Sequence, residues 1–488
     1  CWAFGMVGAA EISLIRQGLA DCSINLSESQ LAYFHNKGTR NEKGVYNDPL
    51  ENFCGDHNEC VNPYHSDYYK KDYYVFSGGG YPMASYTLSS QIGLMEEDER
   101  TAYGEANNEE IEASGLPYAY AFSKDAAVLR NVRLLPLNGN KDAIKQAVLD
   151  YGAVGVGFAA DTSCMDASAH YYYASSDKSN HAVLIVGWDD TISRNNFCDY
   201  STGEKPQTDG AWIARNSWGE SWGINGYIYM SYDTADMSGN KTAYVWEYDQ
   251  PDENTCVYQY DGTECLGAYG YEMPEITMAN VFTSAGSHTL KAVSFWLTNM
   301  ADVDYTVSVY TGVQQGQPTS GKLVAVANGK TDLAGYYTVD LDRPVYLPKG
   351  TSFSLVVKLS GKTKYWINLD YSINYKWTQA VAGTQPGQSY LYYSNKWWDY
   401  SAAAHLSFPS NVRIKGIAVE SDDPYSGSCG PNAYYHLTED GTLEITGSGA
   451  MQNYTAGNPA PWTKYKSWIS QVTVETGITE IGSYAFQG

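Results

Sequence analysis

The sequence predicts an α+β protein in which a helical part comes first and β-rich parts follow. Three observations carry this prediction. Helical patterns fall within the first 152 residues, short β-rich runs begin at residue 154, and apolar and polar residues alternate regularly from about residue 245 to 420. The 488 residues also exceed one ordinary core, so about three domains are expected.

The helical part contains four predicted helices. The first covers residues 2–19, so that Cys1 lies at a helix N-terminus. A second opens at Ser27, because Ser27 and Gln30 have the spacing of a capping box. A weaker third helix follows the glycines at 78–80, and KDAIKQAVLDYG forms a fourth that closes at Gly152.

Strand patterns follow, and they divide the rest of the chain. VGVGF, HAVLIVGW, GAWIARNSW and GYIYMSY predict a sheet that completes a first domain over residues 1–242, with surface insertions at 53–76 and 193–210. Residues 243–420 predict an all-β sandwich, and residues 421–428 form a polar linker. Residues 429–488 have the strand-like steps of one unit of a repeat array.

Composition excludes several classes of function. The formal net charge is −24 and Lys and Arg do not cluster, so no nucleic-acid partner is expected. No run of 18 apolar residues occurs, so no transmembrane segment is expected in this chain. The acidity suits a soluble secreted protein.

Nine cysteines raise the questions of disulfides and of metal binding. The close pairs 54/60 and 256/265 lie in polar, turn-rich surroundings that favour bridges. Cys54, His57 and Cys60 are an alternative set of zinc ligands, but the second ligand pair of a structural zinc site is absent. We therefore expect no metal and no cofactor.

Three residues have the types needed for thiol catalysis. Cys1 lies at a helix N-terminus, where the dipole favours a thiolate; the alternative is an inert, buried cysteine. His181 opens an apolar strand and Asn216 ends another, and each alone has a plain structural explanation. Together they make the cysteine form of a nucleophile, base and orienting residue.

Four motifs in order resemble the papain family of cysteine peptidases. They are CWAF at 1–4, GGYP at 79–82, NHAVLIVGW at 180–188 and RNSWGESWGINGY at 215–227. The resemblance covers the first half of the chain and implies a peptidase of two subdomains, one helical and one β-rich. It makes Cys1 the nucleophile, His181 the general base and acid, and Asn216 the residue that orients the imidazole.

The same resemblance supplies a substrate-binding set. Gly80 would contact the substrate backbone, and Trp218 would shield the bond between His181 and Asn216 from water. Asn180 stands where the family often has aspartate, so the family's pH dependence does not transfer. The full set is Gly79, Gly80, Tyr81, Pro82, Asn180, Ala182 and Trp218.

One expected part of the site precedes residue 1. The family's glutamine, which donates to the oxyanion hole, lies a few residues before the cysteine, so only the backbone N–H of Cys1 remains as a donor within this chain. Losing one such donor typically costs ~10²–10³ in rate. Weak activity of the chain as it stands is therefore expected.

The later regions resemble modules of bacterial surface proteins. Residues 243–420 resemble a lectin-like sandwich that accompanies some secreted bacterial peptidases, and GTLEITGSGAM with ITEIGSYAF resembles the start of a bacterial surface leucine-rich repeat region. Stacking on sugars is an open alternative to packing for four tryptophans, Trp366, Trp377, Trp397 and Trp398.

Together these features predict a secreted or surface-attached bacterial cysteine endopeptidase. Its substrates would be proteins or peptides, and the lectin-like domain would bind a carbohydrate or another cell-surface ligand. The alternative is an adhesin in which the peptidase domain is an inactive scaffold. A third hypothesis is acyl transfer to an amine by the same three residues.

Overall fold

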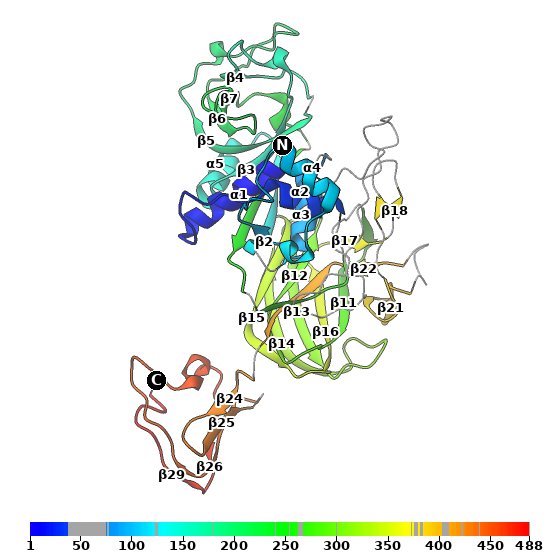
Figure 1. Cartoon of the computed structure of the whole chain (residues 1–488). Helices are drawn as coiled ribbons and strands as arrows, with labels where there is room; N and C mark the ends of the chain where they lie inside the picture. The colour runs from blue at the N-terminus through cyan, green and yellow to red at the C-terminus, as the bar shows by residue number, and fades with distance from the viewer. Residues whose placement is uncertain are drawn as a thin grey trace.

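The computed structural model describes residues 1–37, 75, 78–122, 125–177, 179–239, 241–252, 254–261, 267–298, 300–371, 373–374, 379–380, 384–402, 409–420, 423–438 and 440–487. Figure 1 shows three regions in chain order: a mixed α and β region, a large β region and a small C-terminal β unit. All α-helices of the described part precede residue 152. The predicted α+β class is confirmed.

The described residues of the first region form five α-helices, and four of them were predicted. They are α1 (Trp2–Gln17), α2 (Glu28–Lys37), α3 (Tyr81–Ser89), α4 (Glu105–Ser114) and α5 (Lys141–Tyr151). α1 ends at Gly18, which has the left-handed backbone typical of a helix C-cap, with φ 71°. No helix in the described part of the chain is long and apolar enough to cross a membrane.

Two details of these helices differ from the sequence prediction. The Gln30 N–H donates to Ser27 Oγ at 3.0 Å, as a capping box requires, but the Gln30 side-chain amide donates to the carbonyls of Gly93 and Tyr120 instead of returning to the cap. α4 was not among the predicted helices. Its core anchor is Ile111, which is fully buried.

A twelve-stranded sheet runs through the first and second regions (Figure 1). Its strands along the path are β4 (Tyr171–Tyr172), β7 (Tyr227–Ser231), β6 (Ala211–Arg215), β5 (His181–Asp189), β3 (Val154–Phe158), β8 (Lys241–Asp249), β2 (Asp125–Leu137), β15 (Ala334–Leu347), β12 (His288–Leu297), β23 (Ile414–Glu420) and β9 (Thr255–Tyr258), and β1 (Leu94–Met95) pairs with β2. The strands expected near 154, 181, 211 and 227 are confirmed. β8 runs across the domain boundary expected between residues 242 and 243.

The two regions join where β2 pairs with β15. Val132 lies opposite Tyr336, Arg133 opposite Gly335 and Leu134 opposite Ala334. The apolar core is also shared, because Tyr336 and Trp296 of the second region pack in the core that α1 and α3 cover. The joint is therefore a shared sheet with a shared core.

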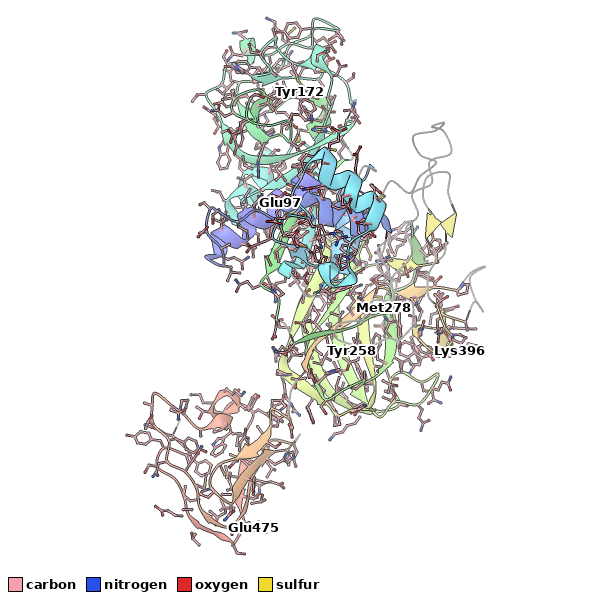
Figure 2. All side chains as sticks on the ribbon, viewed as in Figure 1. Glu97, Tyr172, Tyr258, Met278, Lys396 and Glu475 are labelled. Carbon is pink, nitrogen blue, oxygen red and sulfur yellow. The ribbon has the colours of Figure 1, made fainter. Side chains whose placement is uncertain are left out.

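The second region places two sheets around the largest apolar core of the described residues. Facing the long sheet are β14 (Lys322–Lys330), β13 (Asp304–Thr311), β16 (Ser352–Ser360), β11 (Glu275–Thr283), β20 (Ser389–Tyr393) and β21 (Lys396–Asp399). Shorter strands complete it: β10 (Gly267–Glu272), β17 (Lys364–Asp370) and β22 (Asn411–Val412) in one sheet, β18 (Ile373–Asn374) and β19 (Gln379–Ala380) in another. Figure 2 labels two core residues, Tyr258 and Met278.

The C-terminal unit contains parallel strand pairs. Its strands are β24 (Ser426–Ser428), β25 (Ala433–Leu437), β26 (Thr442–Gly447), β27 (Gly449–Ala450), β28 (Gln471–Val474) and β29 (Ile478–Glu480). β24 falls within the expected linker 421–428. Thr442 of β26 pairs with Gln471 of β28, and Gly449 of β27 with Ile478 of β29, so both parallel pairs join residues 29 apart.

Hydrogen bonds from the second region hold the C-terminal half of α3. The Trp296 indole donates to Ser89 Oγ at 2.8 Å, and the Asn368 side-chain amide donates to the Tyr86 hydroxyl at 3.0 Å. The buried Arg413 guanidinium lies 5.1 Å from the centre of the Tyr86 ring. α3 is thus fixed at this end by the β region.

His35 ties α2 to α3 from inside the core. Its ring lies 4.7 Å from that of Trp2, its Nδ1 is 2.6 Å from Thr87 Oγ1, and only 1% of it is exposed. Burial lowers the pKa of His35 from 6.5 to about 4. The folded protein therefore holds this imidazole neutral at pH 5, where an unfolded chain would protonate it.

Substituting Gly335 tests the joint between the regions. A Cβ at this position would lie 1.9 Å from the Val132 carbonyl oxygen, so Gly335→Ala must push β15 away from β2. We expect the free energy of unfolding to fall by about 2 kcal/mol or more. The matched control is Gly104→Ala, whose Cβ would meet no atom within 4 Å. Equal midpoints of thermal unfolding for the two variants would contradict the prediction.

Acid sensitivity tests the burial of His35. Between pH 6.5 and 4 the unfolded imidazole binds a proton that the folded one refuses, so stability falls as the pH falls. The resulting loss in the free energy of unfolding reaches about 3 kcal/mol at pH 4. We expect His35→Gln to flatten unfolding free energy against pH in this window, measured by denaturant titration. His170→Gln, at a half-buried position, is the control and should keep the wild-type slope.

Candidate active site

Three separate elements bring the predicted site residues to one edge of the sheet. Cys1 precedes α1, His181 is the first residue of β5, and Asn216 directly follows β6. β5 and β6 are antiparallel neighbours, so the start of one lies beside the end of the other. α1 lies close over both strands at Gly8, where a Cβ would come within 3.2 Å of the Leu184 side chain.

A hydrogen bond fixes the orientation of the His181 ring. His181 Nε2 lies 2.8 Å from Asn216 Oδ1, and the backbone N–H of Ser217 donates to the same oxygen at 2.8 Å. The second bond identifies that atom as the amide oxygen, which can only accept, so Nε2 carries the proton. The other ring nitrogen, Nδ1, is left to act as a base.

Asn216 is itself held from two sides. Its backbone N–H donates to the Gly226 carbonyl at 2.9 Å, within the turn that follows β6. Only 9% of the residue is exposed. The amide that orients His181 is therefore a fixed part of the scaffold.

Aromatic rings cover the imidazole. The centre of the Trp218 ring lies 4.8 Å from that of His181, and Phe158 lies 5.3 Å away on another side. Trp222 packs edge-on against Trp218 at 5.0 Å. Trp218 is 41% exposed, so one part of its ring faces solvent while another part contacts the imidazole.

Electrostatics place Cys1 beside this pair. Burial lowers the pKa of His181, the Asn216 hydrogen bond opposes that change, and the positive charge of the Cys1 amino group lowers the pKa further. The last effect requires Cys1 and His181 to be near each other. No acidic side chain lies in the first turn of α1, so the partial positive charge of the helix N-terminus is free to stabilise an anion there.

A half-buried carboxyl, Glu28, interacts electrostatically with the amino group of Cys1. Burial raises the pKa of Glu28 to about 7; Glu11 and Glu97 act in the same direction and Arg215 acts against them. Burial lowers the pKa of the Cys1 amino group, and the negative charge of Glu28 opposes that change. The sequence signal for Glu28 was its place in the first turn after the Ser27 cap, where acidic residues are favoured.

The first four residues of the expected substrate-binding set, at 79–82, lie next to α1 and at the start of α3. Gly79 approaches the Trp2 indole so closely that a Cβ would lie 2.6 Å from it, and Gly80 caps α3 with an extended backbone. Tyr81 is 5% exposed and its hydroxyl donates to the Val183 carbonyl at 3.0 Å, so this side chain packs in the core and binds β5. Pro82 is exposed at the surface.

The strand of His181 carries the remaining expected contacts. Ala182 is half-buried, and Asn180 is exposed, with its side-chain oxygen accepting from the Ala160 N–H at 2.7 Å. Phe158 was missed by the sequence prediction, although it closes the run VGVGF. It lies opposite His181 in the pairing of β3 with β5.

Several other predicted site residues, Cys54, His57, Cys60, Cys265 and Trp377, lie outside the described residues. Within the described ranges, no three His, Cys, Asp or Glu side chains are grouped as metal ligands would be.

The three described tryptophans with a predicted sugar contact lie in two different sheets. Lys364 Nζ lies 4.8 Å above the ring of Trp366, and Lys396 Nζ lies 3.3 Å above the ring of Trp398. Trp397 packs edge-on against Tyr392, which is 38% exposed. Figure 2 labels Lys396 on this outer hairpin of the β region.

Comparisons with known proteins agree with this architecture. Residues 1–248 match the papain family cysteine protease model, and residues 257–418 match the lectin like domain model. Cathepsin K of Mus musculus is 30% identical over 166 residues, 33% of this chain and 43% of the relative. Cathepsin S of Mus musculus is 28% identical over 257 residues, 49% of this chain and 54% of the relative. The chain spans about half the length, or less, of the curated relatives it matches.

Solved structures extend the likeness to the second region. The cysteine protease and lectin-like domains of Cwp84, described as a surface layer associated protein of Clostridium difficile, align over 86% of this chain and 84% of that chain with a TM-score of 0.67 and 24% identity. Cwp84 after propeptide cleavage aligns over 86% and 94% with a TM-score of 0.63 and 23% identity. A peptidase fold joined to a lectin-like β region is therefore a known arrangement. With the family model matching just over half of its length, the chain belongs to the papain family of cysteine proteases.

Proposed function

We propose that the chain hydrolyses internal peptide bonds of proteins or peptides through Cys1, His181 and Asn216. The hydrogen bond between His181 Nε2 and Asn216 Oδ1 carries the proposal, because it leaves Nδ1 available for the thiol proton. An inactive scaffold has no need of this geometry, and all three residues are present. Amine transfer by the same residues remains distinguishable by its products.

The residues act in two steps. The Cys1 thiol gives its proton to His181, and the thiolate attacks the carbonyl carbon of the scissile bond. His181 then returns the proton to the leaving amine, so that an acyl group stays on Cys1 as a thioester. Water, deprotonated by His181, attacks this thioester, releases the acid product and restores the thiol. This chemistry needs no cofactor.

The other regions support a place outside the cell. We propose a secreted or surface-attached bacterial protein, in line with the acidic composition and with the surface-layer association described for Cwp84. The lectin-like domain would bind a carbohydrate or other cell-surface ligand, with Tyr392 and Trp397 as its accessible aromatic pair. The parallel strands 29 residues apart in the C-terminal unit support the start of a leucine-rich repeat region.

Covalent labelling tests the proposed nucleophile. A peptidyl epoxide that alkylates activated thiolates should modify the chain at Cys1 only, as located by mass spectrometry, and Cys1→Ala should abolish the labelling. His181→Ala should slow it roughly a hundredfold, because the base is lost. Labelling at other cysteines, or at Cys1 with equal rate in the His181 variant, would contradict the proposal. Product analysis with an added amine separates the two reactions, because hydrolysis yields the acid product whereas transfer yields mainly the amide.

Substituting Asn216 tests the orienting hydrogen bond. Asn216→Ala should lower kcat for a peptide substrate roughly tenfold or more, because the ring loses its fixed position, while KM stays near the wild-type value. Asn216→Gln should restore little, since the longer side chain cannot keep both hydrogen bonds. Asn196→Ala, at an exposed loop position, serves as the control. A rise in KM without a fall in kcat would contradict an orienting role.

A further inference from the structure

A cavity lies between the peptidase and the lectin-like domain, away from the site described above. Its volume is about 630 Å³, a size typical of small-molecule sites. Strand β2 contributes Asp125 and Leu129 to the wall of the cavity. From the other domain, β9 contributes Val257 and β12 contributes Lys291. Both domains are needed to form it.

Two acceptors in the cavity wall have no hydrogen-bond donor. Asp125 Oδ1 and Gln259 Oε1 are buried without a partner among the described residues. Gln259 is only 2% exposed, and its amide nitrogen is held by the Ser90 carbonyl at 2.9 Å, so the oxygen is fixed in place. Each buried acceptor without a donor costs about 1–3 kcal/mol, so a ligand rich in donors suits this wall.

The other charged groups of the cavity are already paired. Arg130 lies 3.0 Å from Asp249 and 2.5 Å from Asp340, and Lys291 lies 3.6 Å from Asp252. Asp125 is the carboxyl of this wall that has no cationic partner in the described structure. Two positive groups thus face four carboxyls, and the cavity favours a cation.

Asp125 lowers the stability of the folded protein. Burial raises its pKa to about 8, so the folded chain keeps it protonated at neutral pH, whereas an unfolded chain ionises it. The raised pKa of an acid costs stability at every pH above its unfolded value, here above about 4. A residue that costs stability at a cavity wall has the signature of a binding group.

The end of α3 adds to the preference for positive charge. Ser90 and Gln91, which directly follow α3, line the cavity, so the negative end of the helix dipole points towards it. The lining also has an apolar part that includes Leu129, Val257 and Val419. The cavity therefore offers acceptors for a cationic head and an apolar surface for an aliphatic stem.

We propose that this cavity binds a guanidinium group on a short aliphatic stem, as in an arginine side chain. A guanidinium is planar, carries five N–H donors and is weakly hydrated, so it can serve Asp125 and Gln259 together. An ammonium group concentrates its charge on three donors and loses more hydration on entry. Binding would ionise Asp125, so the proton of that carboxyl leaves for solvent as the ion pair forms.

Calorimetry with argininamide tests the proposal. The protein carries Cys1→Ala, so that no substitution in the cavity is confounded with hydrolysis. At pH 7, titrations in two buffers of different ionisation enthalpy should show binding with release of close to one proton. Citrullinamide, the neutral isostere, should not bind, and lysinamide should bind more weakly.

Two variants assign the binding to Asp125. Asp125→Asn should weaken argininamide binding roughly tenfold or more and abolish proton release. Asp252→Asn removes another carboxyl group from the same cavity but leaves Asp125 in place, so it should keep proton release and most of the affinity. Asp125→Asn should also raise the midpoint of thermal unfolding at pH 8, which shows that the variant is folded.

The outcomes divide cleanly. Binding with proton release that depends on Asp125 supports the proposal. Absence of binding, equal binding of citrullinamide, or equal effects of the two variants would overturn it. None of these outcomes bears on peptide hydrolysis, because the cavity is tested in the Cys1→Ala protein.

Discussion

The pairing of β2 with β15 is the constraint on which the rest of the structure depends. It continues the peptidase sheet into the lectin-like domain, and it brings Trp296 and Tyr336 into the core beneath α1 and α3. Backbone hydrogen bonds in a buried sheet leave little freedom for rotation between the parts they join. The two domains therefore behave as one body at this joint.

This joint also reaches the candidate active site. α3 begins at Tyr81, directly after the expected substrate-binding residues Gly79 and Gly80, and ends at Ser89, where the Trp296 indole donates a hydrogen bond. One short helix thus connects the lectin-like domain to these residues of the peptidase domain. The orientation of His181 comes from other contacts, those of Asn216 and Trp218, which belong to the β part of the peptidase.

Local sequence patterns predicted the parts of the molecule that local physics decides. The helix after Cys1, the strand that opens at His181 and the turn after Asn216 each carry their own periodicity and end signals, and the structure has them where expected. α4 escaped because Ile111 is its one fully buried apolar residue, too little to mark a helical face.

Long-range features left no such signal. Residues 334–336 pair with 132–134, some 200 positions earlier, and nothing local to either segment indicates the other. The Asp125 carboxyl lies against Gly93, which is 32 positions earlier in the chain, and nothing in the sequence around either residue indicates the contact. The papain-like motifs gave the identities of the site residues, whereas the second domain's hold on α3 required the three-dimensional structure.

The shared sheet bears on how the chain would withstand the peptidase activity proposed for it. A peptidase of the proposed kind would take its substrate as an extended segment with free backbone groups. Residues 132–134 of β2 are paired with both β8 and β15, and residues 335–336 of β15 are paired with both β2 and β12. At the joint between the domains these backbone groups are already used, so the joint itself would be a poor substrate for the proposed activity.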